Sequence, residues 1–205
     1  MIGASPPPAA RPKPAPDTTP PDTQSASGPS GPTDQGTLTF TFTGADDVTA
    51  TGQLQYSTRL DNGEWSAYSS ATSVTLEVTD GPHSIAVRAL DDAGNEDPTP
   101  AERSFTADTA APTGTVTIQD GVQQTRTATV TLTLSTSDPA PSSGVREMRV
   151  SNTAGGLTSA AWTPYTTTRQ WTVSSGAGTK TVYVQVRDAA ANVSPVAQDT
   201  IRYKP

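Results

Sequence analysis

Oxygen-bearing side chains crowd one short stretch of this 205-residue chain. Asp91, Asp92, Asn95 and Asp97 fall within seven consecutive residues, and Asp108 follows shortly after. Calcium is bound in proteins by about six to eight oxygen ligands, mostly carboxylates and carbonyl groups. These five residues therefore form a candidate calcium site, and calcium is the one cofactor that the sequence suggests. The alternative, which the short spacing favours, is that Asp and Asn hydrogen-bond the backbone of their own turn.

A second copy of this stretch helps to weigh the two interpretations. The stretch of residues 81–95 recurs 97 residues later without a gap, which aligns Asp91 and Asn95 with Asp188 and Asn192. The other acidic residues of the first copy are not repeated. A role common to both copies would rest on the Asp–Asn pair alone, and stabilising a turn needs no more than that pair.

Two aromatic pairs repeat with the same offset. Trp65 and Tyr68 align with Trp162 and Tyr165. Exposed rings of this kind can stack on sugar rings, so the four residues form a candidate glycan-binding platform. The shared spacing favours a shared structural role instead, with one large ring packed on or beside the core of each copy.

The chain has few residues of the types that carry out catalysis. The chain has one His and no Cys, so a zinc site would have only carboxylates to draw on. A Ser–His–Asp triad would need His83 as its base, but Lys180 stands at the matching position of the second copy. No Gly-rich loop precedes a helix, so no nucleotide site is indicated. We therefore expect that the protein is not an enzyme.

The elements that position these side chains have the pattern of β-strands. Leu38, Phe40 and Phe42 alternate with Thr, which is the period of a strand with one buried face. Asn62-Gly63 is a typical hairpin turn, because both residues tolerate positive φ. Turn signals recur about every 8–12 residues, as in a β-sandwich, and no helical period of useful length is present.

The repeat divides the chain into three parts. Residues 17–108 and 109–205 are predicted to be two domains of one kind, each of a size common for a β-sandwich. Residues 1–16 form a Pro-rich arm that favours an extended conformation and cannot pack a core. The arm is expected to be either a flexible leader or an anchor on a partner. Its first residues lack the pattern of a signal peptide, and no apolar run is long enough to span a membrane.

The charge is distributed unevenly. Residues 17–108 contain 15 acidic and 3 basic residues, whereas residues 109–205 contain 5 acidic and 8 basic residues. This asymmetry favours solubility, or head-to-tail attraction between neighbouring copies. Nucleic acid is not an expected partner, because no basic stripe with interleaved aromatic residues is present.

The repeated motif resembles the bacterial immunoglobulin-like repeat, a tandem domain of cell-surface and secreted proteins and of phage structural proteins. The Asp-Thr-x-x-Pro sequences at Asp17 and Asp108 resemble the boundary between such repeats. One departure is Ala191, which replaces the Gly of Ala-Gly-Asn. The other residues that carry the resemblance are Tyr56-Ser57, Leu60 to Gly63, Trp65, Tyr68, Gly81, His83, Val87 to Ala89, Asp91 and Ala93 to Asn95.

The resemblance implies an all-β fold: two tandem immunoglobulin-like (fibronectin III-like) antiparallel β-sandwiches preceded by the Pro-rich arm. It implies a non-catalytic structural or adhesive module, located outside the cell, on its surface or on a virion exterior. We expect an exterior spacer or a subunit of a surface assembly, with other copies or a larger assembly as partners. The alternatives are a virion decoration or fibre protein docked by its arm, and a module that binds a surface glycan. Membrane insertion is not expected.

Overall fold

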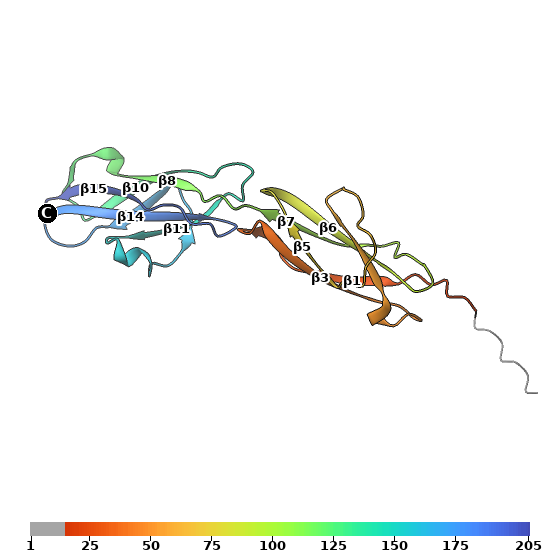
Figure 1. Ribbon diagram of the computed structural model, residues 1–205. Helices are drawn as coiled ribbons and strands as arrows, with labels where there is room; N and C mark the ends of the chain where they lie inside the picture. Colours follow the sequence, from red (N-terminus) through yellow and green to blue (C-terminus); the bar gives the residue numbers. More distant parts are fainter. Residues whose placement is uncertain (1–14) are drawn as a thin grey trace, which may run out of the picture.

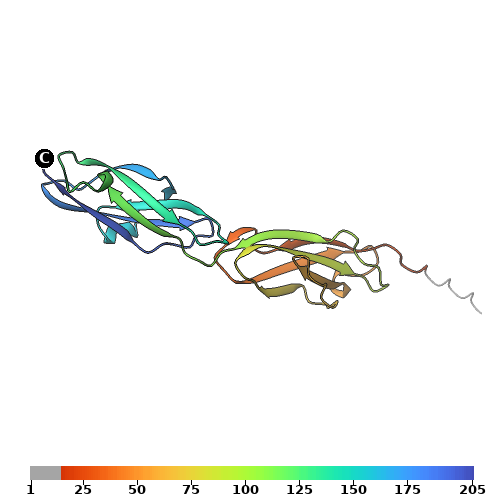
Figure 2. The same ribbon diagram turned by 90° about the horizontal axis from the view of Figure 1, so that it is seen from above.

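The computed structural model describes residues 15–205, so nearly all of the expected Pro-rich arm, residues 1–16, lies outside the described residues. The described chain forms two β-sandwiches that lie end to end (Figures 1 and 2). Its helical elements are three short 3-10 turns: Thr51–Gln53, Gln119–Gly121 and Gly155–Leu157. Within residues 15–205 no helix is long and apolar enough to cross a membrane. The predicted all-β fold is confirmed.

The first sandwich packs a three-stranded sheet against a four-stranded sheet. The three-stranded sheet is antiparallel and contains, in spatial order, β1 (Asp22–Ser27), β3 (Thr37–Ala45) and β5 (Ser73–Glu77). The four-stranded sheet contains, in spatial order, β2 (Gly31–Thr33), β7 (Ala101–Ala107), β6 (Gly81–Leu90) and β4 (Gln55–Leu60).

The second sandwich repeats this plan with a three-stranded and a five-stranded sheet. The three-stranded sheet contains, in spatial order, β13 (Thr168–Thr172), β10 (Thr129–Ser137) and β8 (Thr113–Ile118). The five-stranded sheet contains, in spatial order, β12 (Thr163–Pro164), β11 (Val145–Ser151), β14 (Gly178–Asp188), β15 (Ala197–Tyr203) and β9 (Gln124–Thr125).

Strict alternation builds the two cores. On β3 the side chains of Leu38, Phe40 and Phe42 are buried, while the intervening Thr side chains face solvent. Phe40 meets Phe105 of the facing sheet with ring centroids 5.3 Å apart. A one-residue slip of such a strand would expose its whole apolar face, so the register is tightly specified without a cross-link.

The ends of the two sandwiches correspond residue by residue. β2 and β9 each pair in parallel with the last strand of their sandwich. The backbone N–H of Asp108 donates to the Thr33 carbonyl at 2.9 Å, and that of Lys204 donates to the Thr125 carbonyl at 3.0 Å. Asp108 and Lys204 therefore occupy equivalent positions.

A short linker joins the sandwiches, and side chains fasten it on both sides. Residues 108–112 separate β7 from β8, and the domain boundary predicted after residue 108 falls in this segment. On the first sandwich, the Asp80 carboxylate accepts hydrogen bonds from the Thr109 backbone N–H at 2.9 Å and hydroxyl at 3.2 Å. On the second, the Ser143 N–H donates to the Asp108 carboxylate at 2.7 Å.

Candidate functional site

Two equivalent groups of three carboxylates stand at the N-terminal ends of the two sandwiches. In each group, carboxylate oxygens of the three residues lie within 4.8 Å of one another. Each group combines the Asp of the module entrance, the Asp that follows β3 or β10, and the Asp at the end of β6 or β14. The first cluster contains Asp17, Asp46 and Asp91, and the second cluster contains Asp108, Asp138 and Asp188.

The Asp–Asn pairs make the turn hydrogen bonds that the sequence predicts. The Asp91 carboxylate accepts from both the backbone N–H and the side-chain amide of Asn95, each at 2.7 Å. Asp188 accepts from the same groups of Asn192, each at 2.8 Å. The Asn192 amide also donates to the Asp108 carbonyl at 2.7 Å. Each pair therefore closes its own turn, and the second pair also holds the linker.

Ala191 keeps the shape of the second turn. Its φ is 80°, close to the 92° of Gly94 at the matching position of the first turn. A left-handed conformation costs a residue with a Cβ about 1 kcal/mol, which the surrounding hydrogen bonds offset. The replacement of Gly by Ala thus leaves the geometry of the second cluster intact.

The predicted calcium ligands do not come together as one set. Asp91 and Asp108 belong to different clusters. Asp97 is buried, and its carboxylate accepts hydrogen bonds from the backbone N–H groups of Thr23 and Thr99, each at 2.8 Å.

The remaining predicted ligands, Asp92 and Asn95, belong to neither cluster. Asp92 is exposed, and the amide of Asn95 donates to Asp91. Sequence analysis missed Asp46 and Asp138 as members of the clusters. Their position directly after a strand in both modules was the available signal.

The second cluster crowds like charges, and both clusters contain carboxylate oxygens without a partner among the described residues. Burial and the charges of Asp108 and Asp188 raise the pKa of Asp138. Carboxylate oxygens of Asp17, Asp46 and Asp138 are buried without a hydrogen-bond partner among the described residues. Like charges crowded in a shielded site oppose ionisation unless a cation is present. The carboxylates, together with the nearby carbonyl groups, fit the hard oxygen ligands of calcium.

In the first cluster, hydrogen bonds to Asp91 oppose the effect of burial on its pKa. Burial would raise the pKa of Asp91, but hydrogen bonds from Asn95 and from nearby backbone groups outweigh burial and lower it. Asp91 is therefore held ionised in the first cluster, where Asp17 and Asp46 each keep an unpartnered oxygen.

Of the four repeated aromatic residues, Tyr165 packs against a core, whereas the two Trp rings lie outside the core clusters. Trp65 is half-buried over the outer face of the β4–β6 pair and stacks with the guanidinium groups of Arg59 and Arg88, which lie 4.7 and 4.4 Å from its ring centroid. Arg88 also pairs with Glu96 at 2.8 Å. The alternation of β4 and β6 directs these arginines outward, and the loop after β4 folds over them.

The second sandwich rebuilds the same stack from other positions. Arg149 and Arg187 each lie 4.6 Å from the ring centroid of Trp162, and Arg187 pairs with Glu147 at 2.6 Å. Trp171, which lies on the edge strand β13, packs against the core of the second sandwich. Each stack of cation and ring contributes about 0.5–1 kcal/mol at such half-exposed sites.

The two Tyr residues have separate structural roles. Burial, together with the Glu96 carboxylate, raises the pKa of Tyr68 to about 12. Tyr165 packs against the second core, and its hydroxyl accepts a hydrogen bond from Thr136 at 2.9 Å. Each Trp ring already stacks with two arginine guanidinium groups, which leaves less of its surface for a sugar.

His83 joins two turns. Its Nδ1 lies 3.0 Å from the Asp61 carboxylate, its Nε2 lies 2.8 Å from the Thr79 carbonyl, and its ring stacks on Phe105 with centroids 5.4 Å apart. A hollow of 520 Å³ beside it is lined by several residues, Ser84 among them. Both ring nitrogens face oxygen acceptors, so the ring suits a structural imidazolium better than a general base.

The His83 bridge predicts that stability falls as the pH rises from mildly acidic to mildly alkaline. Burial alone would lower the pKa of His83, but the bonds to Asp61 and Thr79 raise it above 6.5. Its contribution is therefore complete below about pH 6.5 and is lost as the pH rises through the folded pKa. Asp61 has a lowered pKa, because hydrogen bonds from Ser84 and His83 outweigh its burial, so its contribution is lost only in strong acid.

Urea denaturation at about pH 5.5 and at about pH 8.5, on either side of the unperturbed His pKa, measures this effect. We expect the free energy of unfolding to be about 1 kcal/mol higher at the lower pH, the size of one charge-assisted hydrogen bond. His83→Gln should remove most of this difference. An unchanged difference in that variant would show that other groups titrate.

Comparisons with known proteins identify the fold. No family model matches the chain, and no curated protein matches it. The chain is similar to the fibronectin(III)-like modules of Clostridium thermocellum CbhA, with 10% identity and a TM-score of 0.50 over 90% of this chain and 94% of that one. It is also similar to the FN1–FN3 domains of chicken CNTN1, with 12% identity and a TM-score of 0.51 over 91% and 69%. The predicted tandem immunoglobulin-like, fibronectin III-like fold is confirmed.

Proposed function

We propose that this protein is a non-catalytic structural module, an exterior spacer or subunit of a surface assembly that acts through protein–protein contacts. The observation that carries the proposal is the junction. Two sandwiches stand end to end, and the linker between them is tied to both by Asp80, Asp108, Ser143 and Asn192. A rod fastened in this way holds its ends at a fixed separation, which is what a spacer requires.

We propose that bound calcium stabilises this junction. Asp108, Asp138 and Asp188 would hold one ion, and Asp17, Asp46 and Asp91 would hold another at the N-terminal end of the first sandwich. Bound calcium supplies the positive charge that lets all three carboxylates of a cluster stay ionised side by side. The protein's part is to present these carboxylates from a linker and two loops, so that binding restrains all three segments.

Such a rod would serve a bacterial surface, a secreted protein or a virion exterior equally well. The arm on which a docked virion role depends lies almost entirely outside the described residues. The glycan-binding alternative has less support, because arginines lie over both Trp rings.

Small-angle X-ray scattering tests the spacer role. With calcium present, we expect the scattering of the monomer to match one elongated shape with the two sandwiches end to end. Asp138→Ala should broaden the distribution of distances between the sandwiches, because it removes one carboxylate of the junction. Asp120→Ala, which removes an exposed carboxylate away from the junction, is the matched control. A wild-type protein whose sandwiches sample many orientations would contradict the proposal.

A further inference from the structure

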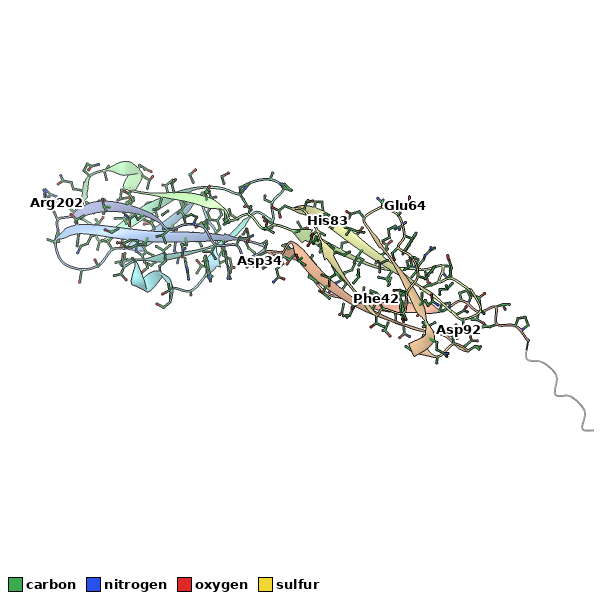
Figure 3. All side chains as sticks on the ribbon, viewed as in Figure 1. Asp34, Phe42, Glu64, His83, Asp92 and Arg202 are labelled. Carbon is green, nitrogen blue, oxygen red and sulfur yellow. The ribbon has the colours of Figure 1, made fainter. Side chains whose placement is uncertain are left out.

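The two ends of the rod carry opposite charge. Figure 3 labels Asp92 near one end of the described chain and Arg202 near the other, with Asp34 at the junction between them. We define the acidic end as the group Asp17, Asp46, Asp47, Asp91 and Asp92. We define the basic end, where β9, β14 and β15 meet, as the group Arg126, Lys180, Arg202 and Lys204.

The basic end differs in charge from the equivalent end of the first sandwich. The pairing of β2 with β7 and of β9 with β15, together with the alignment of Gly81 with Gly178, fixes the equivalences. The first sandwich ends at the junction on Asp34, Asp80 and Asp108. The equivalent residues at the far end of the second sandwich are Arg126, Ala177 and Lys204. The far end of the second sandwich therefore presents positive charge at positions where the equivalent end of the first sandwich presents negative charge.

The acidic end also leaves an apolar side chain uncovered. At the junction, Pro141, in the loop after β10, lies beside Gly81 of the preceding sandwich. The corresponding loop after β3, at the acidic end, carries Val48, whose side chain is 69% exposed. The acidic end thus has the parts of a module junction without a preceding sandwich against it in the described chain.

The basic end offers a matching concave surface. A hollow of 490 Å³ lies there, lined by Arg126 and Lys204 together with Gln124, Thr125 and Pro205. The loop after β3, with Asp47 and Val48 exposed, is of opposite charge to this hollow. Opposite charge at two ends of one molecule favours attraction between copies in a single orientation.

We propose that the protein assembles head to tail, with the basic end of one copy docked on the acidic end of a second copy. The contact would extend the end-to-end arrangement of the covalent junction, with ion pairs taking the place of the linker. This inference rests on the proposed structural role and names its partner. A heterologous contact of this kind does not close on itself when the two ends lie at opposite extremities, so it produces an open filament.

Sedimentation velocity at several protein concentrations measures the assembly. Raising NaCl from about 20 mM to about 500 mM shortens the Debye length from about 20 Å to about 4 Å. We expect the apparent association constant to fall about tenfold or more over this range. A wild-type protein that stays monomeric at low salt and high concentration would overturn the proposal.

Charge reversal identifies the surfaces. Arg126→Asp with Lys204→Asp cancels the positive charge of the defined basic end, and Asp47→Lys with Asp92→Lys removes most of the negative charge of the defined acidic end. Each double variant alone should be monomeric at low salt. An equimolar mixture should regain association as one-to-one dimers, because the unchanged acidic end of the first variant can dock on the unchanged basic end of the second. All four side chains are exposed, and none belongs to a carboxylate cluster.

Matched controls change the same charges elsewhere. Glu64→Lys with Glu102→Lys, and Arg146→Asp, alter exposed residues away from both ends and should assemble like the wild type. Association lost equally in these controls, or a mixture that fails to associate, would show that net charge rather than the two ends is responsible. Scattering by the monomer at high salt still tests the spacer role, so failure of the two proposals can be told apart.

Discussion

Millimolar calcium is expected to raise the melting temperature of this protein. Each cluster concentrates three carboxylates whose oxygens lie within 4.8 Å of one another, and the unfolded chain has no such group. Calcium at about 100 times its dissociation constant would stabilise a one-site module by about 2.7 kcal/mol. For a domain of about 100 residues this corresponds to a rise of about 10–20 °C. Differential scanning calorimetry with calcium and with a chelator measures the shift.

The stabilisation by calcium is expected to depend on pH in a definite direction. Because the pKa of Asp138 is raised, its contribution to stability without calcium is present in acid and is lost as the pH rises through the folded pKa. Calcium favours the ionised carboxylate, so the stabilisation by calcium should be largest near neutral pH and vanish in acid. Asp46→Ala and Asp138→Ala should each reduce the response of one module. A melting curve indifferent to calcium and chelator at neutral pH would remove the metal from the proposed function.

Replacing Asp188 by Ala is expected to lower the free energy of unfolding of the second module by about 2–4 kcal/mol. Asp188 is 1% exposed, and its carboxylate accepts two hydrogen bonds from Asn192. The substitution leaves the Asn192 backbone N–H without its acceptor and the side-chain amide with only its bond to the Asp108 carbonyl. A donor that loses its partner in a shielded position costs more than the hydrogen bond itself contributes. Urea denaturation followed by tryptophan fluorescence measures the loss.

Controls separate the turn from the charge of the cluster. Asp92→Ala removes an exposed carboxylate beside the equivalent turn of the first module and should change stability by less than about 0.5 kcal/mol. A double-mutant cycle of Asp188→Ala with Asn192→Ala should give a coupling energy of about 1 kcal/mol or more. In chelator, removing Asp188 also relieves repulsion at Asp108 and Asp138, so the loss should be smaller than in calcium. A loss equal to that of Asp92→Ala would contradict the structural role of the pair.

Much of the fold follows from local patterns. Alternating residues such as Leu38, Phe40 and Phe42 specify strands with one buried face, because successive side chains of a strand point to opposite sides. The Asp91–Asn95 turn was predictable for the same reason, since its hydrogen bonds join residues four apart. The gapless repeat also predicted that the strands and turns of the first sandwich recur in the second.

The position of the Trp rings was not predictable from these patterns. Trp65 and Trp162 lie in loops after a strand, and a loop has no period that says which face of the sheet it covers. The arginines that receive them stand at different sequence positions in the two modules, so the repeat gave no signal of the stack.

What the sequence determined by itself is therefore the strands, the turns, the tandem repeat and the Asp–Asn pairs around which the turns close. Tertiary structure decided that those pairs belong to clusters of three carboxylates, because Asp17, Asp46 and Asp91 meet only when the module entrance and two loops reach the same end of the sandwich. It also placed Asp92 near one end of the two sandwiches and Arg202 near the other (Figure 3). Both depend on contacts between segments far apart in the chain, and no local pattern encodes such contacts.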